Sequence, residues 1–397
     1  MKSEWKTIRA DEFCSLVTDG THDSPKPQAA GRKLITSKHL KGYYLDFESA
    51  NWISSEDYEK VIARSSVEQW DILYSMIGTI GNVYLEKNPV VDYACKNVGI
   101  FKFGGNCNKA YWMYYYLKSP QAMEFIKAHL RGTTQLYVPL ATLREMPVPV
   151  PDEEEMNKIV AILRTLDDKI QCSIKINDNL EQQAQSYFQE LFVDNADPEW
   201  AIGTISDLGT VVGGSTPSKA KPEYYTESGI AWITPKDLSI NKSKFVSHGE
   251  NDITELGLKN SSAAIMPEGT VLFSSRAPIG YIAIAAGEVT TNQGFKSVVP
   301  KPEIGTPFVY FFLKNTLPVI EGMASGSTFK EVSGSTMKNV PAVIPDAETL
   351  AKFSDFCAPI FAQQRILEEQ NQSLATLRDN LLPKLMSGEI DVSAVQL

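Results

Sequence analysis

Residues 71–81 read DILYSMIGTIG, and residues 270–280 repeat the same pattern as TVLFSSRAPIG in a chain of 397 residues. The neighbouring motifs keep the same order in both halves, because YYYLK at 114–118 corresponds to YFFLK at 310–314. Self-similarity at a fixed spacing is typical of a structural unit that occurs more than once. The sequence therefore predicts two similar halves, each folded in the same way.

Each half begins with a globular part made of short strands. Apolar runs such as DILYSM and TVLFSS are separated by Gly, Pro and Asn, which is the pattern of strands joined by turns. One helix per half is expected, at about 109–130 and 306–322, where aromatic residues cluster. Such rings could stack on bases, but YYY at 114–116 recurs as YFF at 310–312. Because hydroxyl groups are lost in the repeat, we interpret the run as core.

Both halves end in a long helical pattern. From residue 153 to about 192, apolar residues recur at alternating steps of four and three, a 3.5-residue period that is typical of a seam between helices. A helix of some 40 residues would be ~60 Å long, so it has to lie against a partner, and 348–386 is the comparable segment. The predicted seam positions are Ile159, Leu163, Leu166, Ile170, Asn177, Leu180, Leu367, Asn371, Leu374 and Leu381.

Polar and helix-breaking residues interrupt this seam. Asn177 and Asn371 occupy equivalent positions near its middle, where an asparagine either fixes the register of the two helices or turns to solvent. Pro359 is expected to kink the second helix or to mark its effective start. Acidic residues follow Pro151 and Pro345, and carboxylates beside the first turn favour a helix start at both places.

The order of globule, helix, globule and helix predicts an α+β protein. We expect two strand-rich α/β domains in tandem repeat, separated by two long antiparallel coiled-coil helices and related by a pseudo-two-fold axis. The predicted boundaries are a first domain at 1–150, a first long helix at 151–195, a second domain at 196–345, and a second long helix with a C-terminal tail at 346–397.

Composition narrows the class of protein. The net charge is −10, but the segments 151–198 and 346–397 contribute −7 and −4, so the globular parts are nearly neutral. No apolar run reaches the ~20 residues that a bilayer span needs, and the N-terminal residues do not resemble a signal peptide. The five cysteines are scattered, which favours neither disulfides nor a zinc site. We expect a cytoplasmic protein without a metal.

Catalytic motifs are mostly missing from the sequence. There is no phosphate-binding loop, no GxGxxG that opens a helix, no GxSxG and no HExxH. Pro151-Asp152 followed by Asp167-Asp168-Lys169 resembles a nuclease metal array. These residues are about 15 positions apart on one predicted helix, however, which separates them by ~22 Å. We therefore expect no catalytic residue in this chain.

Three short motifs carry a family resemblance. LLPKLMSGEI at 381–390, GGSTPS at 213–218 and WITPKDL at 232–238 are similar to motifs of the specificity (S) subunit of type I restriction-modification systems. The layout of two half-repeats, each a globule followed by a long helix, resembles that family over essentially the whole chain. The first half departs from the pattern, with DGTHDSPKP at 19–27 and LITSKHL at 34–40.

The resemblance implies a division of labour within a prokaryotic, cytoplasmic complex. Each globule would be a target-recognition domain that reads one half of a bipartite sequence in double-stranded DNA. Two modification (M) subunits would dock on the helices and methylate adenine with S-adenosylmethionine, and restriction (R) subunits would cleave DNA with ATP and Mg. The chain itself would hold no cofactor. Two other classes stay open: a stand-alone or remnant endonuclease or methyltransferase component, and a structural coiled-coil adaptor.

Bases are distinguished by side chains that donate or accept hydrogen bonds at base edges, whereas phosphate contacts fix only the register. Polar loop residues of both halves are therefore the candidates for DNA binding, although each could instead be an ordinary solvated or loop-capping residue. The candidates are Lys38, His39, Lys96, Asn97, Arg131 and Gln135 in the first domain, and Lys219, Lys236, Arg276, Asn292, Gln293 and Lys330 in the second.

Overall fold

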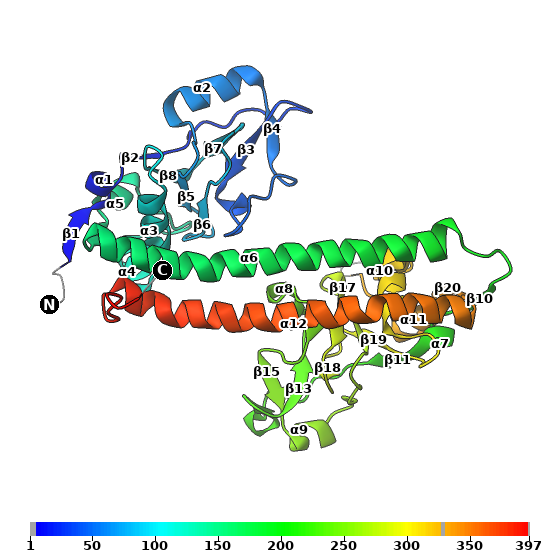
Figure 1. Ribbon diagram of the computed structural model, residues 1–397. Helices are drawn as coiled ribbons and strands as arrows, with labels where there is room; N and C mark the ends of the chain where they lie inside the picture. The colour runs from blue at the N-terminus through cyan, green and yellow to red at the C-terminus, as the bar shows by residue number, and fades with distance from the viewer. Residues whose placement is uncertain (1–4, 327–329, 396–397) are drawn as a thin grey trace. The chain divides into compact units, whose positions relative to one another are not determined.

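The computed structural model of the protein describes residues 5–326 and 330–395. The chain divides into two compact units, which we call unit 1 (Met1–Ile170 with Ser373–Leu397) and unit 2 (Gln171–Gln372). Two long helices, α6 (Glu153–Gln189) and α12 (Ala347–Met386), each contribute residues to both units (Figure 1).

Unit 1 contains three small sheets. Their strand orders are β2-β8-β5-β6, β4-β3-β7 and β1-β9. All pairs are antiparallel except β3 with β7, which are parallel. The elements are β1 (Lys6–Arg9), α1 (Ala10–Phe13), β2 (Leu16–Asp19), β3 (Arg32–Thr36), η1 (Ser37–His39), β4 (Asn51–Ile53), α2 (Ser55–Ser65), β5 (Ile72–Ser75), β6 (Val83–Leu85), β7 (Tyr93–Lys96), β8 (Val98–Lys102), α3 (Cys107–Leu117), α4 (Pro120–Ala128), α5 (Leu140–Glu145) and β9 (Pro147–Val150).

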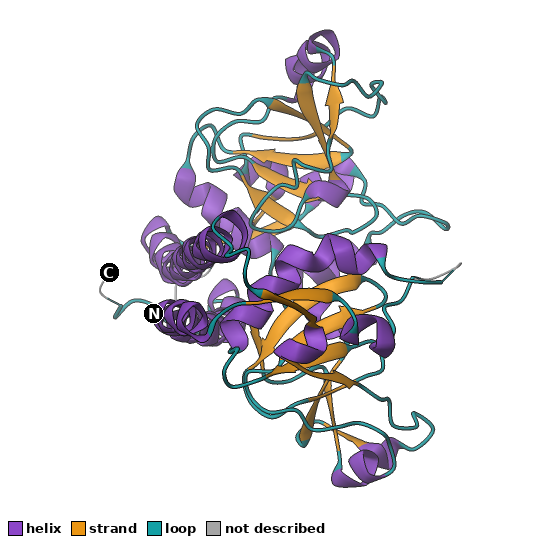
Figure 2. Ribbon diagram, turned by 90° about the vertical axis from the view of Figure 1, so that its right-hand side faces the viewer, coloured by secondary structure: helices purple, strands orange, loops and turns teal. Residues whose placement is uncertain are grey.

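Unit 2 repeats this topology. Its sheets β11-β19-β16-β17-β14, β12-β15-β13-β18 and β10-β20 correspond to the three sheets of unit 1, with β14 and β12 as additional edge strands. Figure 2 shows the strands in orange. The predicted α+β class with a tandem repeat is thus confirmed. The elements are η2 (Glu190–Asp194), β10 (Ala201–Thr204), α7 (Ile205–Leu208), β11 (Gly209–Gly213), η3 (Pro222–Tyr224), β12 (Tyr225–Thr226), β13 (Ile230–Ile233), α8 (Pro235–Ile240), β14 (Phe245–Val246), β15 (Asn251–Ile253), α9 (Glu255–Lys259), β16 (Val271–Ser275), β17 (Ile279–Ala285), β18 (Thr290–Thr291), β19 (Lys296–Pro300), α10 (Thr306–Gly322), α11 (Gly334–Lys338) and β20 (Pro341–Ile344).

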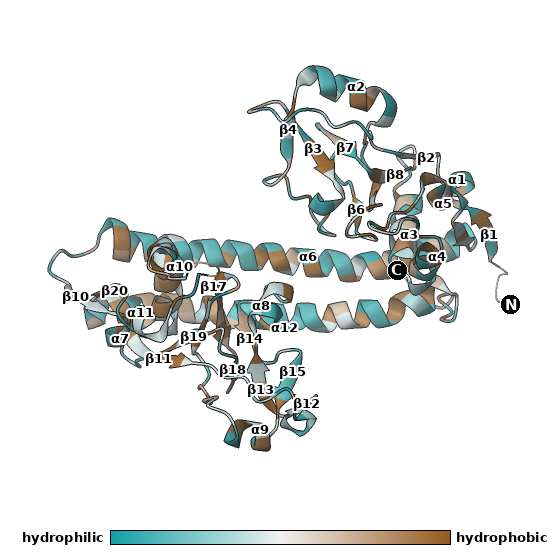
Figure 3. Cartoon of the chain, turned by 180° about the vertical axis from the view of Figure 1, so that it is seen from behind, coloured by the Kyte–Doolittle hydropathy of each residue, from teal (hydrophilic) through white to brown (hydrophobic). Residues whose placement is uncertain are grey.

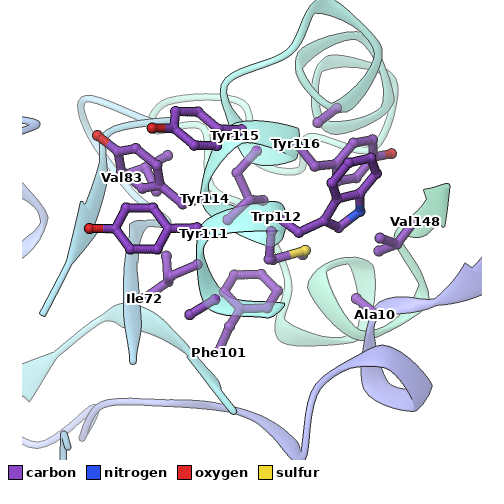
Figure 4. Close-up of a cluster of buried hydrophobic side chains, with 14 of the residues drawn as sticks. Ala10, Ile72, Val83, Phe101, Tyr111, Trp112, Tyr114, Tyr115, Tyr116 and Val148 are labelled. Atoms are coloured by element: carbon purple, nitrogen blue, oxygen red, sulfur yellow. The ribbon is translucent and has the colours of Figure 1, made fainter. Parts of the chain in front are cut away.

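The aromatic run of unit 1 is core, as the sequence predicts. All residues from Ala110 to Leu117 on α3 are buried, and their side chains pack against strands of the unit (Figure 4). The single helix expected at 109–130 was wrong, because the chain breaks between α3 and α4. Ser119 caps the new helix by accepting the Ala122 N–H, and Pro120 occupies its first turn, where a missing N–H costs nothing. In unit 2, α10 continues through Pro318.

Both long helices start at aspartates. Asp152 accepts the Glu155 N–H at 2.8 Å, and Asp346 accepts the Thr349 N–H at 2.9 Å. The alternative that Pro359 marks the effective start of the second helix was wrong, since α12 begins at Ala347. Pro359 is exposed, so the carbonyl that loses its N–H partner can face solvent. Both helices carry apolar and polar residues in alternation (Figure 3).

Within each unit, the segments of α6 and α12 run antiparallel. In unit 1, Ile159 shares a buried cluster with Leu385, and Asp167 forms an ion pair with Arg378 at 2.9 Å. The seam residues of α6 in this unit lie inside: Ile159, Leu163 and Ile170 are buried and Leu166 is half-buried. Leu374 and Leu381 of α12 are also half-buried.

In unit 2, the seam between the two helices contains a pair of polar residues, Asn177 and Gln364, that are joined by hydrogen bonds. The amide group of Asn177 donates to the Gln364 carbonyl at 3.4 Å, and the Gln364 amide donates to the Asn177 carbonyl at 3.2 Å. Asn177 therefore faces the partner helix rather than solvent. Leu180 and Asn371 are half-buried and Leu367 is buried, and the remainder of this seam ends in an aromatic group where Tyr187 meets Phe353 and Phe356.

The end of the chain packs on unit 1. Gly388 adopts a left-handed conformation (φ +67°) that ends α12, and a Cβ there would lie 3.2 Å from the Trp5 ring. Val392 is buried in the core of unit 1, and the Lys158 ammonium group donates to the Ser393 carbonyl at 3.0 Å. Residues 388–393 therefore belong to the packing of this unit.

One carboxylate of α6 gathers several donors in each unit, the buried Asp167 in unit 1 and the half-buried Glu181 in unit 2. In unit 1, Asp167 accepts from the Tyr43 hydroxyl (3.0 Å), the Tyr115 hydroxyl (3.1 Å) and Arg378 (2.9 Å), and we call this the Asp167 cluster. The Glu181 cluster of unit 2 consists of Glu181, Lys244, Lys314, Tyr310 and Gln364. Charges out of water need such compensation, because an unpaired buried charge costs several kcal/mol.

Other expectations concern cysteines and membranes. Cys14, Cys95 and Cys357 are buried, Cys107 is half-buried and Cys172 is exposed, all as free thiols. In the described part of the chain, no helix combines the length and apolar character that a bilayer crossing requires.

The two halves differ in how α3 and α10 meet the neighbouring strand. Trp112 donates its indole N–H to the Pro149 carbonyl at 2.9 Å in unit 1. Phe308 stands at the corresponding position of α10 and has no polar ring atom. Beside it lies a pocket of about 380 Å³, lined in part by Trp200 and Val343.

We predict that Trp112→Phe lowers the free energy of unfolding by about 1–3 kcal/mol, because it removes a hydrogen bond and leaves a void. The reciprocal change, Phe308→Trp, should raise it by about 1 kcal/mol by filling the pocket. Urea unfolding of the full chain, followed by circular dichroism, measures both. Equal effects of the two variants would contradict the assigned difference in packing.

The Glu181 cluster predicts a pH dependence of stability. Burial alone would raise the pKa of Glu181, but Lys244 and Lys314 together lower it from 4.5 to about 2. The ionised carboxylate therefore stabilises the fold above about pH 4.5, and this contribution is lost as the pH falls from 4.5 towards 2. Glu181→Gln should cost about 2 kcal/mol at pH 7 and much less at pH 3. Chemical denaturation at both values tests this, with the exposed Glu190→Gln as control, and a cost independent of pH would contradict it.

Candidate nucleic-acid interface

In unit 1, the loop that follows β2 lies against the turn between β7 and β8. The Nδ1 atom of His22 lies 2.8 Å from Oδ1 of Asn97, and the Lys96 ammonium group contacts the Ser24 hydroxyl. The Ser37 hydroxyl, in η1, donates to the Asn97 carbonyl at 3.0 Å. Three segments that are distant in sequence therefore meet around Lys96 and Asn97.

A buried carboxylate and a left-handed residue shape this turn. Asp19 is buried and accepts Arg64 at 2.9 Å, while Nε2 of His22 lies 3.0 Å from its other oxygen. Asn97 has φ of +53°, a region that asparagine tolerates better than most residues. The backbone conformation of the turn therefore favours asparagine at position 97, independently of any contact that its side chain makes with DNA.

His39 does not lie on the surface. It is 2% exposed, and its Nδ1 atom accepts the Thr36 N–H at 2.9 Å within a capping box of η1. Burial and the neighbouring Lys38 lower the pKa of His39. The selection of His39 for DNA binding is therefore corrected, since its ring serves the fold from inside. Lys38 is exposed on the same turn.

The candidates Arg131 and Gln135 lie on an exposed loop beside the β5–β6 turn. Arg131 and Tyr137 exchange backbone hydrogen bonds at 3.0 and 2.9 Å, which closes the loop. The Val138 N–H donates to the Met76 carbonyl at 2.8 Å and ties the loop to the end of β5. Both side chains are thus presented by a short closed loop, a typical place for binding residues.

Unit 2 brings its corresponding segments together in the same order. The Thr216 hydroxyl contacts Oε1 of Gln293, as His22 contacts Asn97 in unit 1. The N–H of Asn292 donates to the Ile233 carbonyl at 3.0 Å, which places this turn next to the start of α8. The Asn292 side chain accepts the Gly294 N–H at 2.8 Å, so it caps its own turn.

The remaining candidates of unit 2 are charged. Lys236 on α8 forms an ion pair with Glu250 at 2.5 Å, and Arg276 lies 3.4 Å from Glu331. Lys219 and Lys330 are exposed on loops. The Val332 N–H donates to the Ser275 carbonyl at 3.0 Å, which holds the loop of Lys330 beside Arg276.

Three residues at these meeting points were missed by the sequence reasoning. His22 and Thr216 occupy equivalent places in the loops 19–27 and 213–222, and this correspondence across the repeat was a signal that could have identified them. Lys296 lies 3.8 Å from Glu331. Burial lowers the pKa of Lys296, an effect that Glu331 partly offsets, and no sequence signal marked it.

The chemistry available at these loops is recognition by hydrogen bonds and charge. Amide, hydroxyl, ammonium and guanidinium groups gather there, which are the groups that contact base edges and phosphates. Within residues 5–326 and 330–395, no three His, Cys, Asp or Glu side chains come close enough to hold a metal ion.

Comparisons with known proteins agree with this reading. The family described as "Type I restriction modification DNA specificity domain" matches residues 2–182 and 198–377. The MjaIX specificity subunit of Methanocaldococcus jannaschii is 39% identical over 194 residues, 47% of this chain and 45% of that protein. The chain thus spans less than half of that relative. The HindI specificity subunit of Haemophilus influenzae is 24% identical, over 83% of this chain and 88% of its own.

A solved structure shares the fold. The S subunit of a type I restriction-modification system from M. genitalium superposes with a TM-score of 0.59 at 17% identity, covering 96% of both chains. The family match spans both halves of the repeat, and the relatives are named as specificity subunits rather than as methylases or nucleases. The chain therefore belongs to the DNA specificity family of type I restriction-modification systems, as a non-catalytic specificity (S) subunit.

Proposed function

We propose that this S subunit reads a bipartite sequence in double-stranded DNA, with one half-site for each globular domain. The observation that supports this most is the repeated convergence of loops, around Asn97 in unit 1 and around Gln293 in unit 2. Two copies of one reading surface are what a target with two separate halves requires. The domain boundaries at 1–150 and 196–345 belong to this proposal.

The reading surface would act mainly through specific contacts rather than through charge. Amide groups such as Asn97 and Gln293 can make paired hydrogen bonds to adenine, and Arg276 can do so to guanine. Because the globular parts are nearly neutral, phosphate attraction by this chain alone is weak. Partner subunits would supply many of the contacts to the phosphate groups of the DNA.

The long helices would dock two M subunits, and R subunits would join the complex. Apolar side chains of these helices are also exposed: Ile174, Ile176 and Ile366 in unit 2 and Leu377 in unit 1 are 39–48% exposed. Contiguous exposed apolar patches commonly mark protein contacts, and these side chains are the candidates for such a contact on the helices. S-adenosylmethionine, ATP and Mg would bind to those partners, and the complex would act in the cytoplasm of a prokaryote.

We predict that exchanging residues 1–150 for the first domain of another S subunit changes only one half of the methylated sequence. The complex of the hybrid chain with its M subunits would be expressed in a host without other adenine methylation, and sequencing of modified bases would give the motif. An unchanged motif would contradict the division of labour. Methylation or cleavage by the isolated chain would instead favour the enzyme alternative.

A matched pair of substitutions separates the two surfaces. Gln293→Ala should relax specificity in the half-site read by unit 2 by about 1–3 kcal/mol, and Asn97→Ala should do so in the other half-site. Methylation rates on oligonucleotides with single base changes in either half-site measure the effect. If both variants weakened methylation of all sequences equally, neither side chain would read bases.

A further inference from the structure

The segment 241–250 of unit 2, which we call recognition loop 2, contains the two-residue strand β14, which pairs with β17. It leaves the candidate reading surface and returns to it. It begins directly after α8, which carries Lys236, and it ends at Glu250, whose carboxylate lies 2.5 Å from the Lys236 ammonium group. The position of this loop is therefore coupled to a residue expected to contact DNA.

Midway along, the loop is held by side chains of both long helices. The two carboxylate oxygens of Glu368 on α12 accept the backbone N–H groups of Lys244 and Phe245 at 2.8 and 3.0 Å. The Lys244 ammonium group donates to Glu181 of α6 at 2.8 Å and to Gln364 of α12 at 2.9 Å. One dipeptide thus receives contacts from three helix residues.

The contacts of the Lys244 side chain are buried, and they restrict its movement. Lys244 is 7% exposed, and its ammonium group lies 3.4 Å from the centre of the Phe361 ring. Burial lowers the pKa of Lys244 to about 8, although Glu181 opposes this. A lysine of the same loop, Lys242, is exposed and contacts the face of Tyr281 at 4.9 Å.

In unit 1, different residues attach the corresponding loop to the two long helices. The loop after η1 carries Tyr43, whose hydroxyl donates to Asp167 of α6 at 3.0 Å, and Arg378 of α12 completes the contact at 2.9 Å. Both halves therefore tie the loop that follows a candidate reading turn to a carboxylate of α6, although a tyrosine does this in one half and a lysine in the other.

A contribution to stability alone does not explain why a polar contact with α6 is present in both units. Well-packed apolar residues usually stabilise a core as well as a buried ion pair does, whereas directional polar contacts fix one arrangement among several. A polar contact that recurs at the same place of a repeat with different chemistry points to a requirement for position.

We propose that Lys244 is a positioning residue for DNA recognition, which holds recognition loop 2 on the helix pair through Glu181 and Gln364 and so aims Lys236 at its half-site. The proposal rests on the proposed function. Lys244 itself touches no base. The ion pair between Lys244 and Glu181 fixes the position of Lys236, and it thereby determines the specificity of one half-site.

The test uses the full chain in complex with the M subunits of its own host. The variants are Lys244→Met, which keeps the aliphatic stem, Lys244→Arg, which keeps the charge, and Glu181→Gln, with Lys242→Met as the control in the same loop. For each, methylation rates on the cognate oligonucleotide and on oligonucleotides with one altered base in either half-site give a discrimination ratio for each half.

Lys244→Met and Glu181→Gln should lower the ratio for the half-site of unit 2 about tenfold and leave the other ratio unchanged, because the coupling is local. Lys244→Arg should restore most of the loss, and Lys242→Met should match the unaltered chain. Thermal melts identify a variant that fails to fold, and Glu181→Gln then decides the question by the same ratio.

Two results would overturn the positioning role: unaltered discrimination in both Lys244→Met and Glu181→Gln, or an equal loss in both half-sites. A failure of the proposed function itself would be seen differently, because the complex of the unaltered chain would then show no sequence preference in either half-site.

Discussion

A helix of 37 residues with an apolar stripe along one side has to bury that stripe, and the rest of the architecture depends on this constraint. α6 finds its partner in α12, which starts 194 residues later in the chain at an equivalent point. Each globular domain then packs beside a segment of this antiparallel pair. Without the pairing, Asp167 and Glu181 of α6 would lose the donors that Arg378 and Gln364 of α12 supply.

The two halves show how a duplicated fold diverges. The sheet orders correspond except for the edge strands β14 and β12, which are found only in unit 2, and both long helices use an aspartate cap. The contacts that tie loops to α6 differ, since a phenol meets Asp167 whereas an ammonium group meets Glu181. Topology is shared because it rests on hydrophobic pattern, and the polar contacts could change as each half acquired its own loops.

Much of this fold could be predicted from local patterns in the sequence. The repeat, the long helices and the buried aromatic run follow from periodicity, which needs no knowledge of distant contacts. The break at Ser119 depends on a cap that the aromatic pattern concealed. The burial of His39, the pairing of Lys244 with Glu181 and the role of Lys296 depend on residues far away in sequence, and one sequence without its fold does not identify such partners.

The packing of the last residues on unit 1 has a consequence for synthesis of the protein. Unit 2 consists of Gln171–Gln372 alone, whereas unit 1 also needs Ser373–Leu397. A ribosome builds the chain from its N-terminus, and domains can fold as they emerge. The second domain in sequence is therefore the first whose parts are all present, and the first domain waits with an uncovered core, including the site of Val392, until residues 373–395 have been synthesised.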